Sequence, residues 1–323
     1  MNGAFCKFKN ILTNICSGEN HDGILLSGGL DSSILAYHIR PKHSITITID
    51  KESPDYFYSS LIAKRKYSID HHRVITTYNE VISNIEELVA EFKTFDPIFL
   101  KNSVVQLMGF KTAKKINIKS LVIGDGADEL FAGYNFLHKY IGEPQKLNDK
   151  INSIIQNMDF FSIKFSKKIG LNIFLPFLQT EIIEFSQKIS LVEKISQHNG
   201  IFYGKFFLRK CYEDILGKEI VWREKNALEL GSGVTNLKYY IENYIFNDSE
   251  YTVEEEKAKS EGVEIRSKEQ LYFYRIYRKF FNPPKEDKNN ESDITKKCPF
   301  CKSMFSWKGN FCKVCGAFPV IFK

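Results

Sequence analysis

The feature that most constrains the fold of this chain is an alternation, in its first half, of short apolar runs and segments with helical spacing of apolar residues. The first run, at residues 23–26, leads into a glycine-rich turn, as a buried parallel strand does. Strands separated by helices form βαβ units, so the alternation predicts a parallel sheet flanked by helices. The expected strands cover residues 23–26, 44–49, 74–76 and 121–123, and the expected helices cover residues 32–40, 55–67, 79–92 and 104–115.

The second half of the chain shows little strand signal. Beyond Tyr134, apolar residues recur mostly at helical spacing, which predicts a helical second half packed on the sheet. Asn282, Pro283 and Pro284 end the last expected helix, and polar residues of mixed charge follow, as in a linker. The expected parts are an N-terminal extension at 1–22, an α/β domain at 23–281, a linker at 282–297 and a small module at 298–323.

Composition excludes several classes of protein. Apolar residues make up 43% of the 323 residues, which is enough for a sizeable core and rules out a disordered or fibrous chain. The net charge of +6 is too small for a chain of this length to indicate nucleic-acid binding by itself. No apolar run approaches the roughly 20 residues of a membrane span, and the first residues lack the apolar core of a secretion signal. With an odd number of cysteines, seven, these features predict a cytoplasmic protein without a disulfide framework.

A loop rich in serine and glycine follows the first expected strand and opens a helix. Glycine lets the backbone approach a phosphate closely, and the N-terminus of the helix offers free N–H groups. Asp31 would repel a phosphate unless a cation lay between them, so its presence indicates Mg²⁺. The alternative is a tight turn in which an Asp or Ser caps the helix. The residues that could surround a phosphate are Ser27, Gly28, Gly29, Asp31, Ser32 and Ser33.

A second loop, at residues 124–134, follows the fourth expected strand. It places Asp125, Asp128 and Glu129 within five residues, which is unfavourable unless the charges are paired or bind a metal. The alternative is a solvated loop whose acids cap a helix. That alternative is weakened because Asp31 follows another strand of the same expected sheet, and ligands bind at the carboxyl edge of such sheets.

Both loops resemble known motifs. The loop at 27–33, SGGLDSS, is similar to the SGGxDS signature of PP-loop ATP pyrophosphatases, which cleave ATP between its α and β phosphates. The loop at 124–134, GDGADELFAGY, resembles a motif of the synthetase domain of asparagine synthetases. The resemblance covers residues 23–281 and identifies the chain as a member of that family, within the PP-loop superfamily. Further matches follow in the family's order: the LWRxK segment at 221–225, a glycine loop at 231–234 and a closing helix at 268–281.

The resemblance implies an ATP-dependent ligase that forms AMP and pyrophosphate. Such an enzyme adenylates a carboxylate, with aspartate as the default, for transfer to ammonia or another amine. Lys225 would place positive charge on the α-phosphate, and Asp31 and Asp128 would hold Mg²⁺. Asp125 and Glu129 would be the further catalytic carboxylates. The residues implied in ATP binding are Ser27, Gly28, Gly29, Asp31, Ser32, Ser33, Ile49 and Gly124.

The sequence departs from the family in three respects. Only 22 residues precede the first expected strand, so we expect no glutaminase domain, and nitrogen from free ammonia or a separate glutaminase. The family's glutamate in the acidic loop is Asp125 here, which is one methylene shorter. The family's E-A-R-x-P-F-L-D segment keeps only Pro-Phe-Leu within residues 171–179, which leaves the substrate open.

Four cysteines near the end of the chain have the spacing Cys-x2-Cys-x10-Cys-x2-Cys. Two such knuckles supply four thiolates for tetrahedral Zn²⁺, and Gly316 gives the second knuckle the freedom that its turn needs. The spacing predicts a zinc ribbon; a redox pair or free buried thiols are the alternatives. A ribbon binds RNA or protein, or docks on its own domain, and Lys302, Trp307, Lys308 and Lys313 give this one a modestly basic, aromatic face. The expected ligands are Cys298, Cys301, Cys312 and Cys315.

Two other functions stay open. A PP-loop enzyme that modifies tRNA by adenylation would bind RNA through the ribbon, although the acidic loop argues against it. A non-enzymatic nucleotide-binding regulator is disfavoured by intact Asp31, Asp128 and Lys225. The pair His71-His72 is expected to be solvated in a loop between a helix and a strand.

Overall fold

The computed structural model describes residues 2–18, 21–67, 69–286, 295–306 and 310–320. The chain folds into two compact units, each built from two stretches of sequence. The first unit comprises Met1–Ile75 and Met108–Ala227, and the second comprises Thr76–Leu107 and Leu228–Lys323. Within the described ranges, no helix is both long enough and apolar enough to cross a bilayer.

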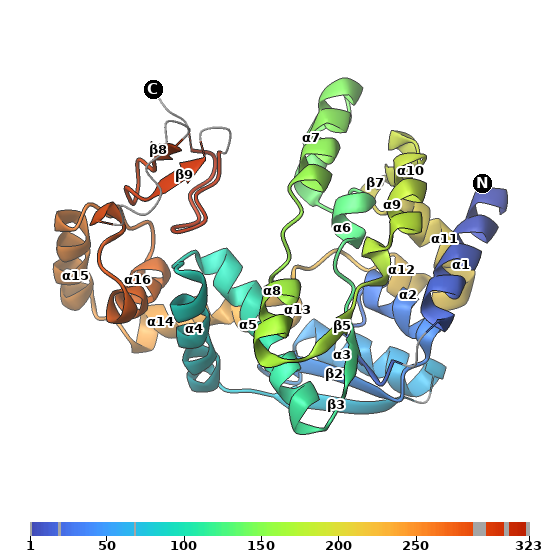
Figure 1. The fold of residues 1–323 in the computed structure, drawn as a ribbon, viewed down its shortest axis with the longest axis horizontal. Coiled ribbons are helices and arrows are strands. Elements are labelled where there is room, and N and C mark those ends of the chain that lie inside the picture. The colour runs from blue at the N-terminus through green and yellow to red at the C-terminus, as the bar shows by residue number, and fades with distance from the viewer. Residues whose placement is uncertain (1, 19–20, 68, 287–294, 307–309, 321–323) are drawn as a thin grey trace. The chain divides into compact units, whose positions relative to one another are not determined.

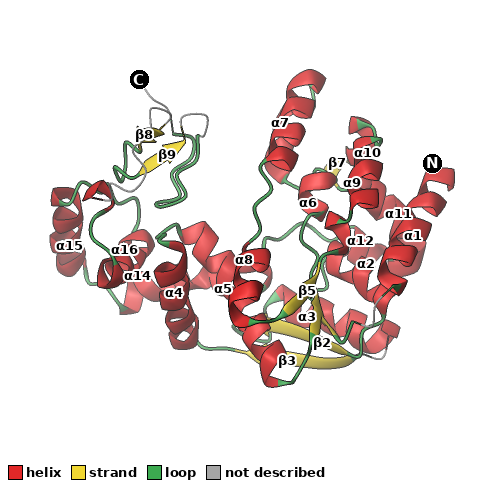
Figure 2. Cartoon of the chain, in the orientation of Figure 1, coloured by secondary structure: helices red, strands yellow, loops and turns green. Residues whose placement is uncertain are grey.

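The first unit is built on a five-stranded sheet in which all neighbouring strands are parallel (Figure 2). The strand order is β3-β2-β1-β4-β5, so β1 is central. Gly23 pairs with both His43 and Leu121, which brings the carboxyl ends of β1, β2 and β4 to the same edge. The predicted parallel sheet flanked by helices is therefore confirmed. The strands are β1 Gly23–Leu25, β2 His43–Thr48, β3 Asp70–Ile75, β4 Ser120–Val122 and β5 Asn172–Phe174.

Helices lie around this sheet in the first unit (Figure 1), and α5 begins in the second unit and ends in the first. An antiparallel hairpin, β6 Ile195–His198 and β7 Ile201–Gly204, precedes α11. The helical elements are α1 Asn2–Ser17, α2 Leu30–Ile39, α3 Pro54–Ser60, the π-helix Leu61–Tyr67, α5 Pro97–Lys115, α6 Ala127–Leu130, the 3-10 helix Asn135–Tyr140, α7 Pro144–Gln156, α8 Phe161–Ile169, the 3-10 helix Pro176–Leu178, α9 Thr180–Gln187, α10 Leu191–Lys194, α11 Phe206–Leu216 and α12 Lys218–Val221.

The second unit is helical apart from one antiparallel hairpin near the end of the described chain. Its α16 packs against α4, α14 and α15. The helical second half that the sequence predicts is present. The elements are α4 Tyr78–Phe92, α13 Leu228–Gly231, the 3-10 helix Val234–Asn236, α14 Leu237–Tyr244, α15 Asp248–Ser260, α16 Lys268–Phe280, the 3-10 helix Pro284–Glu286, β8 Thr295–Lys297 and β9 Met304–Ser306.

Several strands differ from the sequence prediction. β3 begins at Asp70, earlier than expected, because it pairs with β2 along the whole length of both strands. His71 and His72 therefore lie in a strand, and the expectation of a loop was wrong. β5, β6 and β7 were not predicted, since three or four residues carry too little alternation to be recognised and their pairing depends on distant contacts.

Aromatic side chains fill the core of the first unit beneath α1, which packs against α2 and α9. Phe8 of α1 is completely buried, and its ring lies 5.3 to 6.4 Å, between centroids, from the rings of Phe131, Phe185, Phe207 and Tyr212. The segment 1–22, expected as an extension, thus contributes a helix to this core.

Replacing Phe8 with alanine should destabilise the protein by about 3–5 kcal/mol, because it leaves a cavity among four buried rings. Phe57→Ala is the matched control, since Phe57 is 58% exposed and its loss should change stability by no more than about 0.5 kcal/mol. Urea unfolding followed by far-ultraviolet circular dichroism measures both variants. Equal midpoints for the two variants would contradict the packing described.

Candidate active site

Carboxylates from the two predicted loops meet at one lysine. The Nζ of Lys205 lies 2.5 Å from Oδ2 of Asp31, in α2, and 2.7 Å from Oδ1 of Asp128, in α6. Lys225 forms a further ion pair with Oδ2 of Asp128. The structure thus brings together Asp31, Asp128 and Lys225, which the sequence singles out, and adds Lys205 to them.

Lys205 is held in place by the backbone around it. It lies between β7 and α11, and its N–H donates to the carbonyl of Phe131 at 3.0 Å. Its side chain is only 4% exposed. Sequence reasoning missed this residue because a single lysine outside any recognised motif carries no signal. Only the tertiary fold shows that it lies between two acids.

Burial and charge have opposing effects on the pKa values of this ion network. Burial alone would raise the pKa of Asp128, but the ammonium groups of Lys205 and Lys225 outweigh it and hold that pKa well below its usual range. Burial would lower the pKa of Lys205, yet the carboxylates of Asp128 and Asp31 raise it. Burial and the neighbouring Lys205 lower the pKa of Lys225 in spite of its carboxylate partner. Lys225 therefore loses its proton more readily than a solvated lysine does.

The close approach of Asp128 to Lys205 depends on Gly133. A Cβ at this position would overlap Oδ1 of Asp128 and Cε of Lys205. The N–H of Gly133 also donates to the carbonyl of Asp128 at 2.8 Å, which closes the acidic loop. Any side chain at Gly133 would force the two charged groups apart.

The loop after β1 leaves two buried polar atoms unsatisfied. Within the loop, the N–H of Gly29 donates to Oγ of Ser27 at 3.2 Å, and Oγ of Ser32 donates to the carbonyl of Gly29 at 3.3 Å. Oδ1 of Asp31 and Oγ of Ser33, in contrast, have no hydrogen-bond partner in the described part of the chain. A buried polar atom without a partner is unfavourable. The carboxylate oxygen of Asp31 therefore fits a ligand that a cation would complete.

Other predicted nucleotide-binding residues lie at the same edge of the sheet. Gly124 borders the loop after β1, since a Cβ there would lie 3.3 Å from Cβ of Asp31. Ile49 directly follows β2 and is half-buried. Thr48, the last residue of β2, has a buried hydroxyl without a partner among the described residues. Sequence reasoning did not single out that hydroxyl, because the sequence pattern only predicts that Thr48 belongs to a strand.

Arg223, within the match at 221–225, joins this segment to the loop after β1. Its guanidinium donates to the carbonyl of Ser27 at 3.3 Å and lies 2.8 Å from Oδ1 of Asp55. It also lies over the ring of Tyr58, at 4.2 Å from the centroid. Burial raises the pKa of Asp55 to about 6, although Arg223 opposes the rise. The sequence match included Arg223 but did not assign it this bridging position.

Arg209 of α11 supports the same segment from the other side. Its guanidinium donates to the carbonyls of Val221 and Arg223, the second at 3.0 Å, and to the carbonyl of Gly204 at 3.0 Å. The residue is buried. These bonds fix the backbone that carries Lys225.

The two other predicted catalytic carboxylates have different partners. Ser162 of α8 donates to Oδ2 of Asp125 at 2.6 Å. Tyr134 donates to Oε1 of Glu129. Burial raises the pKa of Glu129, the hydrogen bond from Tyr134 opposes the rise, and the charge of Asp128 adds to it.

The two remaining matched motifs lie in the second unit. Glu229, beside the predicted glycine loop at 231–234, and Glu269, in the closing helix, both pair with Nζ of Lys101 of α5 at 3.2 Å. The side chains of all three residues are at most 15% exposed. Burial raises the pKa of Glu269, and Lys101 opposes the rise. This buried trio links three segments that are far apart in the sequence.

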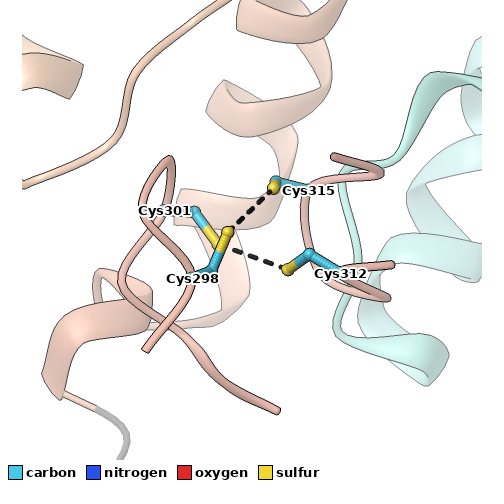
Figure 3. Close-up of side chains that lie close together, drawn as sticks. All are labelled: Cys298, Cys301, Cys312 and Cys315. Atoms are coloured by element: carbon cyan, nitrogen blue, oxygen red, sulfur yellow. Dashed lines mark hydrogen bonds between the residues drawn. The ribbon is translucent and has the colours of Figure 1, made fainter. Parts of the chain in front are cut away.

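The four predicted zinc ligands converge in the second unit (Figure 3). Sγ of Cys298 lies 3.8 Å from Sγ of Cys315, and Sγ of Cys301 lies 3.7 Å from Sγ of Cys312. Thiolates at about 2.3 Å from tetrahedral Zn²⁺ are about 3.8 Å apart, so the group fits that ion. Gly316 has φ +73°, as the turn of the second knuckle requires.

The cysteine-bearing segment is fixed to the helices of the second unit. Arg266 and Gln270 both donate to the carbonyl of Cys315, Gln270 at 2.8 Å. The N–H of Phe95 donates to the carbonyl of Val314 at 2.8 Å. Docking on its own chain, one of the alternatives for a ribbon, is therefore observed.

Parts of the predicted linker and ribbon lie outside the described residues. These parts are residues 287–294 of the linker and residues 307–309 and 321–323 of the ribbon, among them Trp307 and Lys308 of the basic aromatic face. The two other lysines of that face, Lys302 and Lys313, are exposed.

The fold and site define a class of protein: an α/β domain whose carboxyl edge combines a serine-glycine loop with two acids and the two lysines that pair with them. The asparagine synthase family model matches residues 16–167 and 164–295. The chain therefore belongs to the asparagine synthase family.

Known proteins agree with this assignment. The chain is 27% identical to the glutamine-hydrolyzing asparagine synthetase of Gallus gallus over 293 residues, which cover 85% of this chain and 51% of that protein. It is 30% identical to the enzyme of the same name from Rattus norvegicus over 72% of this chain and 43% of that one. For asparagine synthetase B of Escherichia coli (strain K12) the identity is 23%, over 81% and 50%. The chain spans about half the length of these curated relatives.

Among solved structures, a predicted subunit of tRNA methyltransferase from Methanocaldococcus jannaschii DSM matches 59% of this chain and 87% of that chain. The TM-score is 0.28 and the sequence identity is 15%. This likeness is too low to support an argument about function.

Replacing Cys312 with serine should remove one tightly bound equivalent of Zn²⁺ relative to the unchanged protein. A hydroxyl is a much weaker ligand than a thiolate, so the tetrahedral site would be incomplete. Cys6→Ser is the matched control, because Cys6 is exposed and lies outside the cluster. Elemental analysis after dialysis measures the zinc content. A Cys312→Ser protein that keeps all its zinc would show that the cluster is not the site.

Proposed function

We propose that this chain is an ATP-dependent ligase that forms AMP and pyrophosphate, and that it adenylates a carboxylate before an amine attacks it. The observation that carries the proposal is the meeting of Asp31, Asp128, Lys205 and Lys225 at the carboxyl edge of the sheet. Membership of the asparagine synthase family supports it, and so do the names of the relatives. Aspartate and ammonia are the first substrates to test.

The proposed reaction has two bond exchanges. An oxygen of the carboxylate attacks the α-phosphorus of ATP, and the bond from that phosphorus to the oxygen bridging the β-phosphate breaks. Pyrophosphate leaves with the electron pair. The amine then attacks the carbonyl carbon of the acyl adenylate, AMP leaves, and the nitrogen gives up a proton to complete the amide.

The ion network supplies the charges that this reaction needs. Asp31 and Asp128 would hold Mg²⁺, whose charge offsets that of the phosphates. With a cation bound, these carboxylates would no longer neutralise Lys205 and Lys225, and both ammonium groups would be available to phosphate oxygens. Lys225 would stabilise the negative charge that develops at the α-phosphate in the transition state.

Glu129 is the carboxylate that we assign to proton transfer from the amine. Its raised pKa makes it a better proton acceptor near neutral pH than an ordinary glutamate. The hydrogen bond from Tyr134 would hold its carboxyl in place. Asp125, bound by Ser162, would position the acidic loop next to it.

The products formed from ATP test the proposal directly. With Mg²⁺, aspartate and ammonium, chromatography should find AMP and pyrophosphate in equal amounts. Asp128→Asn should lower turnover by roughly 100-fold or more, since it weakens both the cation site and the lysine network. Asp149→Asn is the control, because Asp149 is an exposed residue of α7. Formation of ADP and phosphate instead would exclude the proposed reaction.

The same assay identifies the substrate and the nitrogen source. Separate reactions replace aspartate with other amino acids or bulk tRNA, and ammonium with glutamine. We expect ammonium to support amide formation and glutamine alone not to. Activity that appears only with tRNA would indicate a tRNA-modifying enzyme rather than an amide ligase.

Replacing Lys225 with alanine should lower kcat far more than it weakens ATP binding, because its charge acts mainly in the transition state. Since burial lowers the pKa of Lys225, the unchanged enzyme should lose activity on the alkaline side at a lower pH than a solvated lysine would give. Lys225→Arg keeps a charge that does not titrate there, so its alkaline limb should move to higher pH. Profiles of kcat/KM against pH measure the shift. Superimposable profiles for the two proteins would rule out this role.

A further inference from the structure

Two histidines and an aspartate meet at the amino edge of the sheet. His43 is the first residue of β2 and Asp70 the first of β3, and the two are paired in register. His72 lies two residues after Asp70, so its side chain points to the same face of the strand. Nδ1 of His43 lies 3.2 Å from Oδ2 of Asp70 and 3.2 Å from Nε2 of His72. Nε2 of His72 lies 3.5 Å from Oδ2 of Asp70.

These three distances match those between the ligands of a tetrahedral metal ion. Imidazole nitrogens bind Zn²⁺ at about 2.0–2.1 Å and carboxylate oxygens at about 2.0–2.2 Å, which places neighbouring ligand atoms about 3.3–3.5 Å apart. The three donor atoms therefore already form one face of a tetrahedron.

Solvent can reach the group. The side chains of His43, His72 and Asp70 are 22%, 29% and 64% exposed. An ion could enter from solution, and water could occupy the fourth position.

We propose that His43, Asp70 and His72 form a second transition-metal site, which binds Zn²⁺ or a similar divalent ion together with a water molecule. Two imidazoles and one carboxylate favour this class of ion over Mg²⁺ or Ca²⁺, which prefer oxygen ligands alone. The site lies at the opposite end of β2 from the candidate active site, at about 17 Å along a six-residue strand. It contributes no group to the proposed reaction.

The role that follows from this position is structural. β3 is an edge strand of the sheet and is paired with β2. A metal bound to His43 on β2 and to Asp70 and His72 on β3 would link the ends of the two strands. Ions that bind the folded state alone stabilise it by mass action, so added metal should raise the melting temperature.

His71 provides a matched control within the same strand. Its side chain points to the other face, where Nδ1 lies 2.7 Å from Oγ of Ser44 and Nε2 lies 3.1 Å from Oγ of Ser59. His71 and His72 are adjacent in the sequence but lie on opposite faces of β3, so only His72 belongs to the proposed site.

The experiment is a cobalt titration of the full chain after the four cysteines have been loaded with Zn²⁺. We expect one further equivalent of Co²⁺ to bind, with the visible absorption of a tetrahedral ion and without thiolate charge-transfer bands, which excludes the cysteine cluster. His72→Ala and Asp70→Ala should lose this equivalent and the accompanying rise in melting temperature. His71→Ala should keep both.

A measurement on the unchanged protein avoids the folding of variants. Added Zn²⁺ should shift the ¹⁵N resonances of Nδ1 of His43 and Nε2 of His72 in the manner of metal coordination. If no further equivalent binds and these resonances do not move, the three residues are only a hydrogen-bonded group and the proposal is wrong. Undiminished binding in both His72→Ala and Asp70→Ala would place the ion elsewhere and would overturn it as well.

Discussion

The ion network around Lys205 is the interaction on which the candidate site depends. The ammonium group of Lys205 is almost entirely buried. Burying this charge would be unfavourable without the carboxylates of Asp31 and Asp128. These carboxylates lie in the first turns of α2 and α6, which follow the neighbouring strands β1 and β4, so one side chain fixes the relative position of both helices. Lys225 adds a second positive charge and gives the network two ions of each sign.

A glycine and hydrogen bonds to backbone carbonyls make this network possible. Gly133 leaves the space in which Asp128 and Lys205 touch. Arg209 and Arg223 bind backbone carbonyls, so they fix the segment that carries Lys225 to α11 and to the loop after β1. The charged groups of the site are thus held by contacts that do not themselves take part in the proposed reaction.

The second unit is organised by a different constraint. Four buried cysteines converge at distances that fit Zn²⁺, and hydrogen bonds to the carbonyl of Cys315 join them to Arg266 and Gln270. In α16, Gln270 directly follows Glu269, which pairs with the buried Lys101. Hydrogen bonding to the cysteine-bearing segment and a buried ion pair therefore both anchor the first turn of α16.

The sequence by itself determined the parallel sheet, the two loops at its carboxyl edge, the family and the four cysteines. These features depend on residues close together in the chain, such as strand runs, glycine turns and cysteine pairs, so local patterns reveal them. Only the tertiary structure placed Lys205 between Asp31 and Asp128 and revealed β5. It also separated His71 and His72 onto opposite faces of β3. The role of a buried charge depends on partners that are distant in the sequence. A short strand can be recognised only from the neighbouring strand with which it pairs. No local pattern carries that information, because it arises only when the chain has folded.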